Sequence, residues 1–208
     1  MEKNKIGFTI FKTLLALPFY LIYRPKKINK NLIPKNGPII LCGNHTHAFD
    51  SPLVILCSKR MIHFMAKDEY HKGKASWWFK IMGTIPVDRT KKDDKAYNSA
   101  IEVLNNNNAL ALFPEGTRNK TDKVLLPLKF GVVSLAKKTN ATIVPFIITG
   151  QYKFLSKDLK IKFLEPFKIG KMDLEEANKK LTNILEKNLK EAFKNGEKRH
   201  IYSENKRK

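Results

Sequence analysis

The chain has 208 residues, enough for one α/β domain with a sizeable core, and its 40 Lys and Arg against 19 Asp and Glu give a formal charge of +21. This balance favours polyanionic partners, namely nucleic acid, an anionic membrane face or phosphorylated substrates. The two cysteines, Cys42 and Cys57, form no C-x-x-C pair, which excludes a disulfide or zinc framework and is typical of buried thiols in a reducing compartment.

The chain begins with an apolar segment over residues 6–23, interrupted by Lys12 and by Pro18. It is slightly short for a bilayer-spanning helix and carries a charge, and no small-residue cleavage site follows it. A marginal span, a helix packed on the core and a helix pair in the membrane interface remain as alternatives. Aromatic residues in the segment and the basic residues Arg24, Lys26 and Lys27 after it favour the interfacial helix pair, with a cytosolic body.

Strand and helix patterns then alternate along the chain. Short apolar runs predict strands at 38–43, 62–67, 84–88, 109–113, 142–150 and 159–167. Helical spacing and capping signals predict helices at 50–59, 76–83, 93–105, 129–139 and 173–196. The residues from 197 onward are typical of a solvated tail. This order indicates a single α/β domain.

The stretch "GNHTHAFDSP", residues 43–52, follows the first of these strands. Asp50, at the start of the next helix, could reach back to one ring nitrogen of His45, and the other nitrogen would face the crevice beyond the strand ends. Such a pair is the arrangement of a general base, in which the carboxylate fixes the tautomer and stabilises the imidazolium. The local residues leave helix capping by Asp50 equally open, and a metal site of His45, His47 and Asp50 is a third alternative.

Three later stretches carry residues suited to an anion. "GTIPVDR" ends a short strand with Arg89, and "FPEGTRNK" places Glu115, Gly116, Thr117 and Arg118 in a turn after another strand. Glycine lets backbone N–H groups approach an anion, and arginine binds phosphate through two parallel hydrogen bonds. "LPLKFG" places Lys129 at a predicted helix start, where phosphate is favoured.

The four blocks "NHTHAFD", "GTIPVDR", "FPEGTR" and "IVPFIITG" occur in an order that resembles the glycerolipid acyltransferase family, and most closely its bacterial lysophosphatidate acyltransferases. The resemblance covers about residues 38–150. It matches the family's N-H-x-x-x-x-D at Asn44, His45 and Asp50. A serine is common in the family where His47 stands here, which keeps the metal alternative open.

The resemblance implies that an acyl group is transferred from acyl-CoA or acyl carrier protein to the free hydroxyl of lysophosphatidate, giving phosphatidate, without a cofactor or metal. By match, His45 is the base, Asp50 orients it, and Arg89, Glu115, Gly116, Thr117 and Arg118 hold the phosphate head group. Lys129 joins them on charge and placement. We further expect "IVPFIITG" to provide strand packing and a wall of the acyl site.

The fold expected is a single-domain mixed α/β sheet flanked by helices. We expect residues 1–30 to form the membrane-interface segment, 31–196 the acyltransferase domain and 197–208 a basic tail. The protein would then sit on the cytoplasmic face of the cell membrane, bound to anionic lipid.

Other functions remain as alternatives. Within the family, the acceptor could be glycerol-3-phosphate or another lysophospholipid. Outside it, the charge alone would suit a nucleic-acid-binding protein, although no stacking platform or recognition helix is evident, so no nucleic acid is expected as a partner. A metal-dependent hydrolase would use His45, His47 and Asp50.

Overall fold

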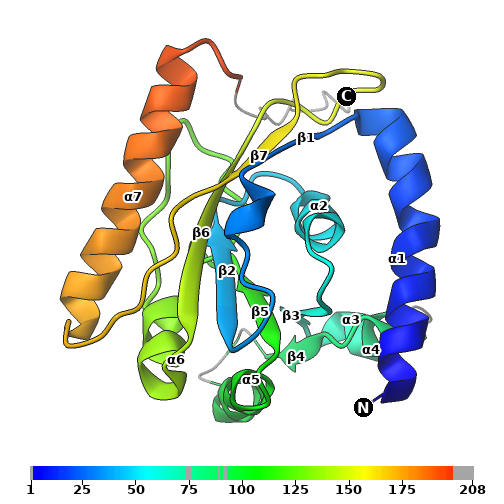
Figure 1. The fold of residues 1–208 in the computed structure, drawn as a ribbon, viewed down its shortest axis with the longest axis vertical. Helices are drawn as coiled ribbons and strands as arrows, with labels where there is room; N and C mark the ends of the chain where they lie inside the picture. Colours follow the sequence, from blue (N-terminus) through cyan, green and yellow to red (C-terminus); the bar gives the residue numbers. More distant parts are fainter. Residues whose placement is uncertain (1, 74–75, 89, 91–92, 199–208) are drawn as a thin grey trace.

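The fold is built on one mixed β-sheet (Figure 1). A computed structural model describes residues 2–73, 76–88, 90 and 93–198. Within them the strands are β1 (Lys26–Ile28), β2 (Ile39–Gly43), β3 (Ile62–Lys67), β4 (Ile85–Val87), β5 (Ala109–Leu112), β6 (Thr142–Thr149) and β7 (Lys160–Phe163). Their order across the sheet is β1-β7-β6-β2-β5-β3-β4. All neighbours are parallel except β6 and β7, which are antiparallel.

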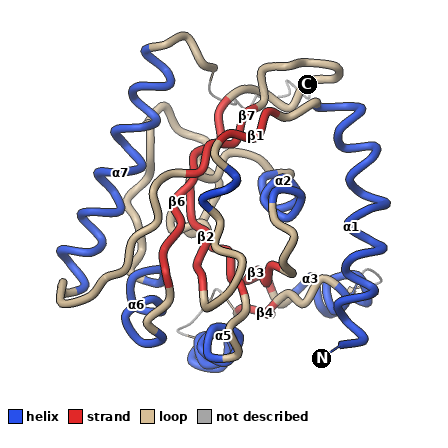
Figure 2. The backbone as a smooth tube through the Cα atoms, viewed as in Figure 1, coloured by secondary structure: helices blue, strands red, loops and turns tan. Residues whose placement is uncertain are grey.

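Helices cover both faces of this sheet (Figure 2). They are α1 (Glu2–Tyr23), α2 (Asp50–Cys57), α3 (Glu69–Lys72), α4 (Ser76–Ile81), α5 (Asp94–Asn105), α6 (Gly131–Thr139) and α7 (Leu174–Lys194), with a 3-10 turn at Lys30–Leu32. In Figure 2, α6 and α7 lie to the left of the sheet, while α2 and then α1 lie to its right. The expected mixed α/β sheet flanked by helices is therefore confirmed.

The alternation of apolar residues along the central strands explains the layers. Ile40 and Cys42 of β2 pack into the cluster that α5, α6 and α7 cover, whereas Ile39 and Leu41 face the α2 side. Helix α7 buries Ala177, Leu181, Leu185 and Leu189, which recur at helical spacing; Leu174, which we expected in the same apolar stripe, is 38% exposed. Its N-cap is Asp173, whose carboxylate accepts the Glu176 N–H at 2.8 Å, as the capping pattern predicts.

The N-terminal segment differs from the predicted helix pair. It forms one helix, α1, which continues through Pro18. Phe8 and Phe19 are buried in the cluster on the α2 side of the sheet, so α1 is also part of the core. No helix within the described residues is both long and apolar enough to cross a bilayer.

Two smaller differences concern the ends of the chain. Strand β1 was not predicted and pairs with β7, with Lys26 opposite Lys160. At the other end, the Glu197 carboxylate binds Lys160 Nζ of β7 at 2.8 Å, so the first residue of the predicted tail contacts the sheet. Residues 199–208 lie outside the described residues.

Both cysteines are buried, as predicted. Burial raises the pKa of the Cys42 thiol far above its usual value and that of Cys57 to about 12. Neither thiol is therefore an activated nucleophile.

Candidate active site

The loop between β2 and α2 brings the predicted pair of residues together. His45 Nδ1 lies 2.8 Å from Asp50 Oδ2. The Asp50 side chain is fully buried, and 17% of the His45 side chain is exposed. Asp50 is the first residue of α2, whose N-cap is Phe49, and its carboxylate turns back to accept N–H groups of the preceding loop.

Four donors surround the Asp50 carboxylate. Besides His45, the backbone N–H groups of Thr46 and His47 donate to Oδ2 at 2.7 and 2.8 Å. The hydroxyl of Tyr152 donates to Oδ1 at 2.7 Å. Burial, and then the negative charge of Asp50, raise the pKa of Tyr152 well above its usual value, so the phenol stays protonated and donates. These donors compensate the carboxylate for the loss of water.

The ring of His45 is held in one orientation. It stacks on Phe113, with ring centroids 4.0 Å apart and an angle of 11° between the planes. Because an ionised carboxylate only accepts, His45 Nδ1 donates to Asp50, and Nε2 keeps its lone pair. Nε2 makes no hydrogen bond within the described part of the chain. A neutral imidazole with one nitrogen fixed and the other open can act as a general base.

The backbone of His45 is fixed as well, by the stretch that contains "FPEGTR". Glu115, which is buried, accepts the His45 N–H at 2.7 Å through Oε1 and the Leu126 N–H at 2.8 Å through Oε2. The carbonyl of His45 accepts the Asn119 N–H at 2.7 Å. Glu115 was also predicted to hold phosphate, which stays a prediction; in the structure its carboxylate binds these backbone N–H groups and positions the loop of His45. Sequence reasoning missed Asn119, which no motif singles out.

Asn44 connects the same loop to β6. Its buried side chain donates to the Ile148 carbonyl at 2.9 Å and accepts the Ile148 N–H at 2.7 Å. Next to it, Gly43 lies so close to Phe146 that a Cβ would be 2.3 Å from the Phe146 carbonyl oxygen. The block "IVPFIITG" thus packs against the loop that carries His45, as its expected packing role requires.

The predicted phosphate-binding residues lie partly together. Gly116 has a φ of +71°, and a methyl group there would lie 2.8 Å from Lys129 Cε, so the Lys129 side chain crosses this turn. The Lys129 N–H also donates to the Pro114 carbonyl at 2.8 Å. Thr117 and Arg118 of the same turn are exposed. Arg89 lies outside the described residues, and phosphate binding by this group stays a prediction.

The local geometry also bears on a metal at His47. His47 Nδ1 accepts the Phe49 N–H at 3.2 Å, and its ring stacks on Tyr152 with centroids 4.4 Å apart. Both oxygens of Asp50 are directed at hydrogen-bond donors. Among the described residues, no three His, Cys, Asp or Glu side chains gather as metal ligands would. The donor set therefore does not support the metal-dependent hydrolase.

Comparison with known proteins identifies the family. The Acyltransferase family model matches residues 24–149, which include the His45–Asp50 pair and the Glu115 loop. The chain belongs to this acyltransferase family. The 1-acyl-sn-glycerol-3-phosphate acyltransferase of Bacillus subtilis is 30% identical over 153 residues, covering 72% of this chain and 70% of the relative.

Other family members agree with this assignment. The acyltransferase of the same name from Streptococcus pneumoniae is 27% identical over 155 residues and is covered over 57% of its length. The chain thus spans little more than half of that relative. The crystal structure of the 1-acyl-sn-glycerophosphate (LPA) acyltransferase PlsC from Thermotoga maritima superposes with a TM-score of 0.70 at 23% identity, covering 92% of this chain and 79% of PlsC. At that identity the likeness shows a shared fold.

Proposed function

We propose that this acyltransferase moves a fatty acyl group from a thioester donor to the free hydroxyl of lysophosphatidate, giving phosphatidate for phospholipid synthesis. The observation that carries the proposal is the His45–Asp50 pair, with Nδ1 bound to the carboxylate and Nε2 open. The names of the relatives indicate the acceptor. Either acyl-CoA or acyl carrier protein would supply the acyl group.

In this reaction His45 Nε2 takes the proton of the acceptor hydroxyl as its oxygen attacks the thioester carbonyl. The carbon–sulfur bond breaks, the thiolate leaves, and the imidazolium returns the proton to it. Because a thiol has a pKa of about 8.5, the thiolate is a good leaving group and the enzyme needs no nucleophile of its own. Asp50 stabilises the imidazolium while it carries the proton.

The phosphate of the acceptor would bind at the turn after β5, through the backbone at Gly116 and the side chains of Arg118 and Lys129. We also assign Thr117 and, from the sequence alone, Arg89 to this site. Glu115 serves it indirectly, by holding the loop through the His45 and Leu126 N–H groups.

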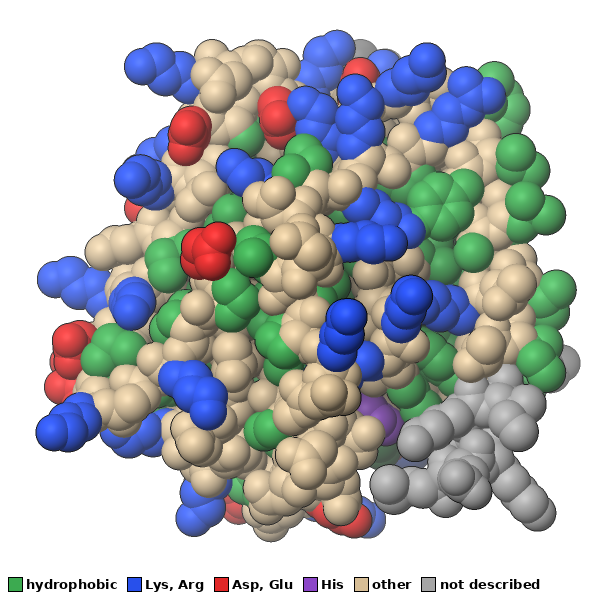
Figure 3. All heavy atoms as spheres, in the orientation of Figure 1, with side chains coloured by type: hydrophobic (Ala, Val, Ile, Leu, Met, Phe, Trp, Pro, Cys, Tyr) green, Lys and Arg blue, Asp and Glu red, His purple; other side chains and the backbone are tan. Residues whose placement is uncertain are grey.

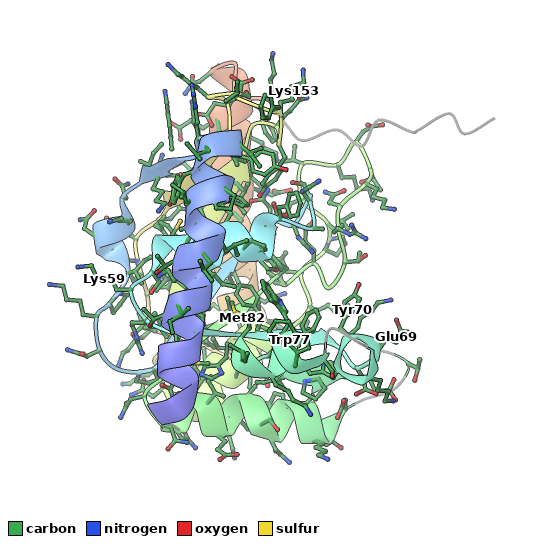
Figure 4. All side chains as sticks on the ribbon, turned by 90° about the vertical axis from the view of Figure 1, so that its right-hand side faces the viewer. Lys59, Glu69, Tyr70, Trp77, Met82 and Lys153 are labelled. Carbon is green, nitrogen blue, oxygen red and sulfur yellow. The ribbon has the colours of Figure 1, made fainter. Side chains whose placement is uncertain are left out.

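Membrane association is the second part of the proposal. Ile10, Leu14, Leu17 and Leu21 of α1 recur at helical spacing and are 57–68% exposed. Figure 3 shows hydrophobic side chains along the edge of the molecule that α1 forms, with Lys and Arg beside them. On the α1 face, Figure 4 also shows Trp77 of α4 near the lower part of the helix and Tyr70 of α3 farther from it; both are at least half exposed. An exposed apolar stripe with aromatic and basic neighbours suits peripheral attachment to the anionic cytoplasmic leaflet.

The first test is thiol release by the purified protein in detergent, with lysophosphatidate and an acyl-CoA or acyl carrier protein donor. We expect release to require the acceptor and to fall by at least about a hundredfold in His45→Ala, as loss of a general base predicts. Asp50→Asn should fall similarly because it changes the ring tautomer. Activity in EDTA should persist. Release that survives His45→Ala would contradict the assignment, and a preference for glycerol-3-phosphate or another lysolipid would change the acceptor.

A further inference from the structure

Tyr152 binds the catalytic carboxylate, although it belongs to none of the four sequence blocks. It follows β6 and donates its hydroxyl to Asp50 Oδ1 at 2.7 Å. Asp50 Oδ2 receives the bonds from His45, Thr46 and His47, so Tyr152 is the donor to Oδ1 among the described residues. Since Asp50 is fully buried, water cannot readily replace that donor.

Aromatic side chains from two other elements hold the ring of Tyr152. It stacks on His47, and the rings of Phe49, Phe19 and Tyr23 meet it at centroid distances of 6.0, 6.4 and 5.5 Å. Phe19 and Tyr23 belong to α1. These five residues, His47, Phe49, Tyr152, Phe19 and Tyr23, form what we call the aromatic cluster.

The backbone makes the same connection between α1 and the segment that carries Tyr152. The Leu155 N–H donates to the carbonyl of Ile22, near the end of α1, at 2.6 Å. Helix α1 therefore contacts the segment after β6 through both side chains and backbone, and this segment contacts Asp50. A continuous set of contacts joins the exposed N-terminal helix to the catalytic pair.

We propose that Tyr152 is a positioning residue that orients Asp50 toward His45, and that the aromatic cluster makes this orientation depend on the docking of α1. The proposal rests on the proposed acyl transfer for its role in catalysis. A displaced Asp50 would hold His45 Nδ1 less well and would stabilise the imidazolium less.

The test is Tyr152→Phe, with Tyr97→Phe as a matched control. Tyr97→Phe also removes one hydroxyl hydrogen bond, of 2.6 Å, but that bond joins Tyr97 of α5 to Ser134 Oγ of α6. We expect Tyr152→Phe to lower kcat about tenfold, as loss of a hydrogen bond to a buried charge predicts, with KM for lysophosphatidate within about twofold. Tyr97→Phe should retain kcat. Retention of kcat by Tyr152→Phe would overturn the proposal.

A spectroscopic readout separates positioning from a general loss of structure. The His45 Nδ1 proton should give a low-field proton resonance, assigned by its disappearance in His45→Ala. We expect Tyr152→Phe to shift this resonance and Tyr97→Phe to leave it in place. An unshifted resonance in Tyr152→Phe would overturn the proposal. Because this signal needs no turnover, it reports on the contact of Asp50 with His45 even if lysophosphatidate is not the acceptor. Absence of acyl transfer in the wild type would contradict only the proposed function.

The dependence on α1 is tested by Phe19→Leu against Phe8→Leu. Both phenylalanines are buried on α1, but only Phe19 belongs to the aromatic cluster. We expect Phe19→Leu to shift the same resonance and to lower kcat, while Phe8→Leu does neither. Equal effects of the two substitutions would overturn the dependence on α1.

Discussion

Two buried carboxylates, Asp50 and Glu115, act on the same histidine in different ways. Asp50 binds the ring of His45, and Glu115 binds its backbone N–H. Glu115 accepts a second N–H, from Leu126, and so ties the two loops together. The position of His45, the proposed general base, thus depends on both carboxylates, although only Asp50 touches the ring.

The substitution Glu115→Gln separates this role from phosphate binding. The amide that replaces the carboxylate would face one backbone N–H with an N–H of its own, leaving a buried donor without an acceptor. We expect the free energy of unfolding to fall by about 2 kcal/mol and kcat to fall, with KM for lysophosphatidate little changed. Urea unfolding and steady-state kinetics measure both.

The control is Glu186→Gln, which weakens an exposed ion pair with Lys190 at 3.4 Å and should change stability by less than about 0.5 kcal/mol. If Glu115→Gln raised KM and left stability unchanged, the phosphate-binding role predicted from the sequence would stand.

Spacing within one short stretch made the His45–Asp50 contact one of three alternatives, and the resemblance to the acyltransferases selected it. The sequence could not predict that Tyr152 binds Asp50, because Tyr152 follows β6, far from Asp50 along the chain, and belongs to no motif. The sequence also could not predict which groups the Glu115 carboxylate binds, because the His45 and Leu126 N–H groups come close to it only in the folded loops.

At the scale of elements, α1 has two faces with different roles. One buries Phe8 and Phe19 in the core, and the other exposes the stripe of Leu14, Leu17 and Leu21. Removing the whole helix would therefore damage the core and the aromatic cluster together with the proposed membrane binding. Substitution of the exposed face alone distinguishes these effects.

We expect the triple variant Leu14→Ser, Leu17→Ser, Leu21→Ser to weaken partition into anionic vesicles by at least about tenfold, because burial of each leucine contributes about 1.5 kcal/mol or more. Its unfolding midpoint should stay near that of the wild type, since these side chains are exposed. Leu174→Ser, on α7 across the sheet, is the control and should bind vesicles normally. Vesicle sedimentation measures the partition, and unchanged binding of the triple variant would refute the attachment.

Most helices and strands could be predicted because the spacing of apolar residues that indicates them is local in the sequence. The sequence suggested a helix pair at the N-terminus because a proline usually interrupts a helix. The structure has the single helix α1, which continues through Pro18 because the packing of Phe8 and Phe19 supports it on both sides. Strand β1 has too few residues for a period to be read, and pairing with β7 rather than local propensity defines it.

For the whole molecule, we expect the formal charge of +21 to contribute electrostatically to the proposed lipid binding. We expect affinity for vesicles of anionic lipid to fall by about tenfold or more between 0.05 and 0.5 M salt, because exposed charges are screened over about 4 Å at the higher value. Affinity for neutral phosphatidylcholine vesicles should be weaker and nearly independent of salt. Equal binding to both vesicle types at low salt would show that the charge does not contribute.

The pairing of β1 with β7 also has a consequence for how the chain folds during synthesis. Helix α1 and β1 leave the ribosome before β7, so Lys26 cannot meet its partner until Lys160 has been made. The strands from β2 to β6 can assemble meanwhile, since their pairings do not require β1. The nascent α1 therefore lacks its strand anchor until β7 has been made. If α1 binds the bilayer as proposed, it can do so before the sheet is complete.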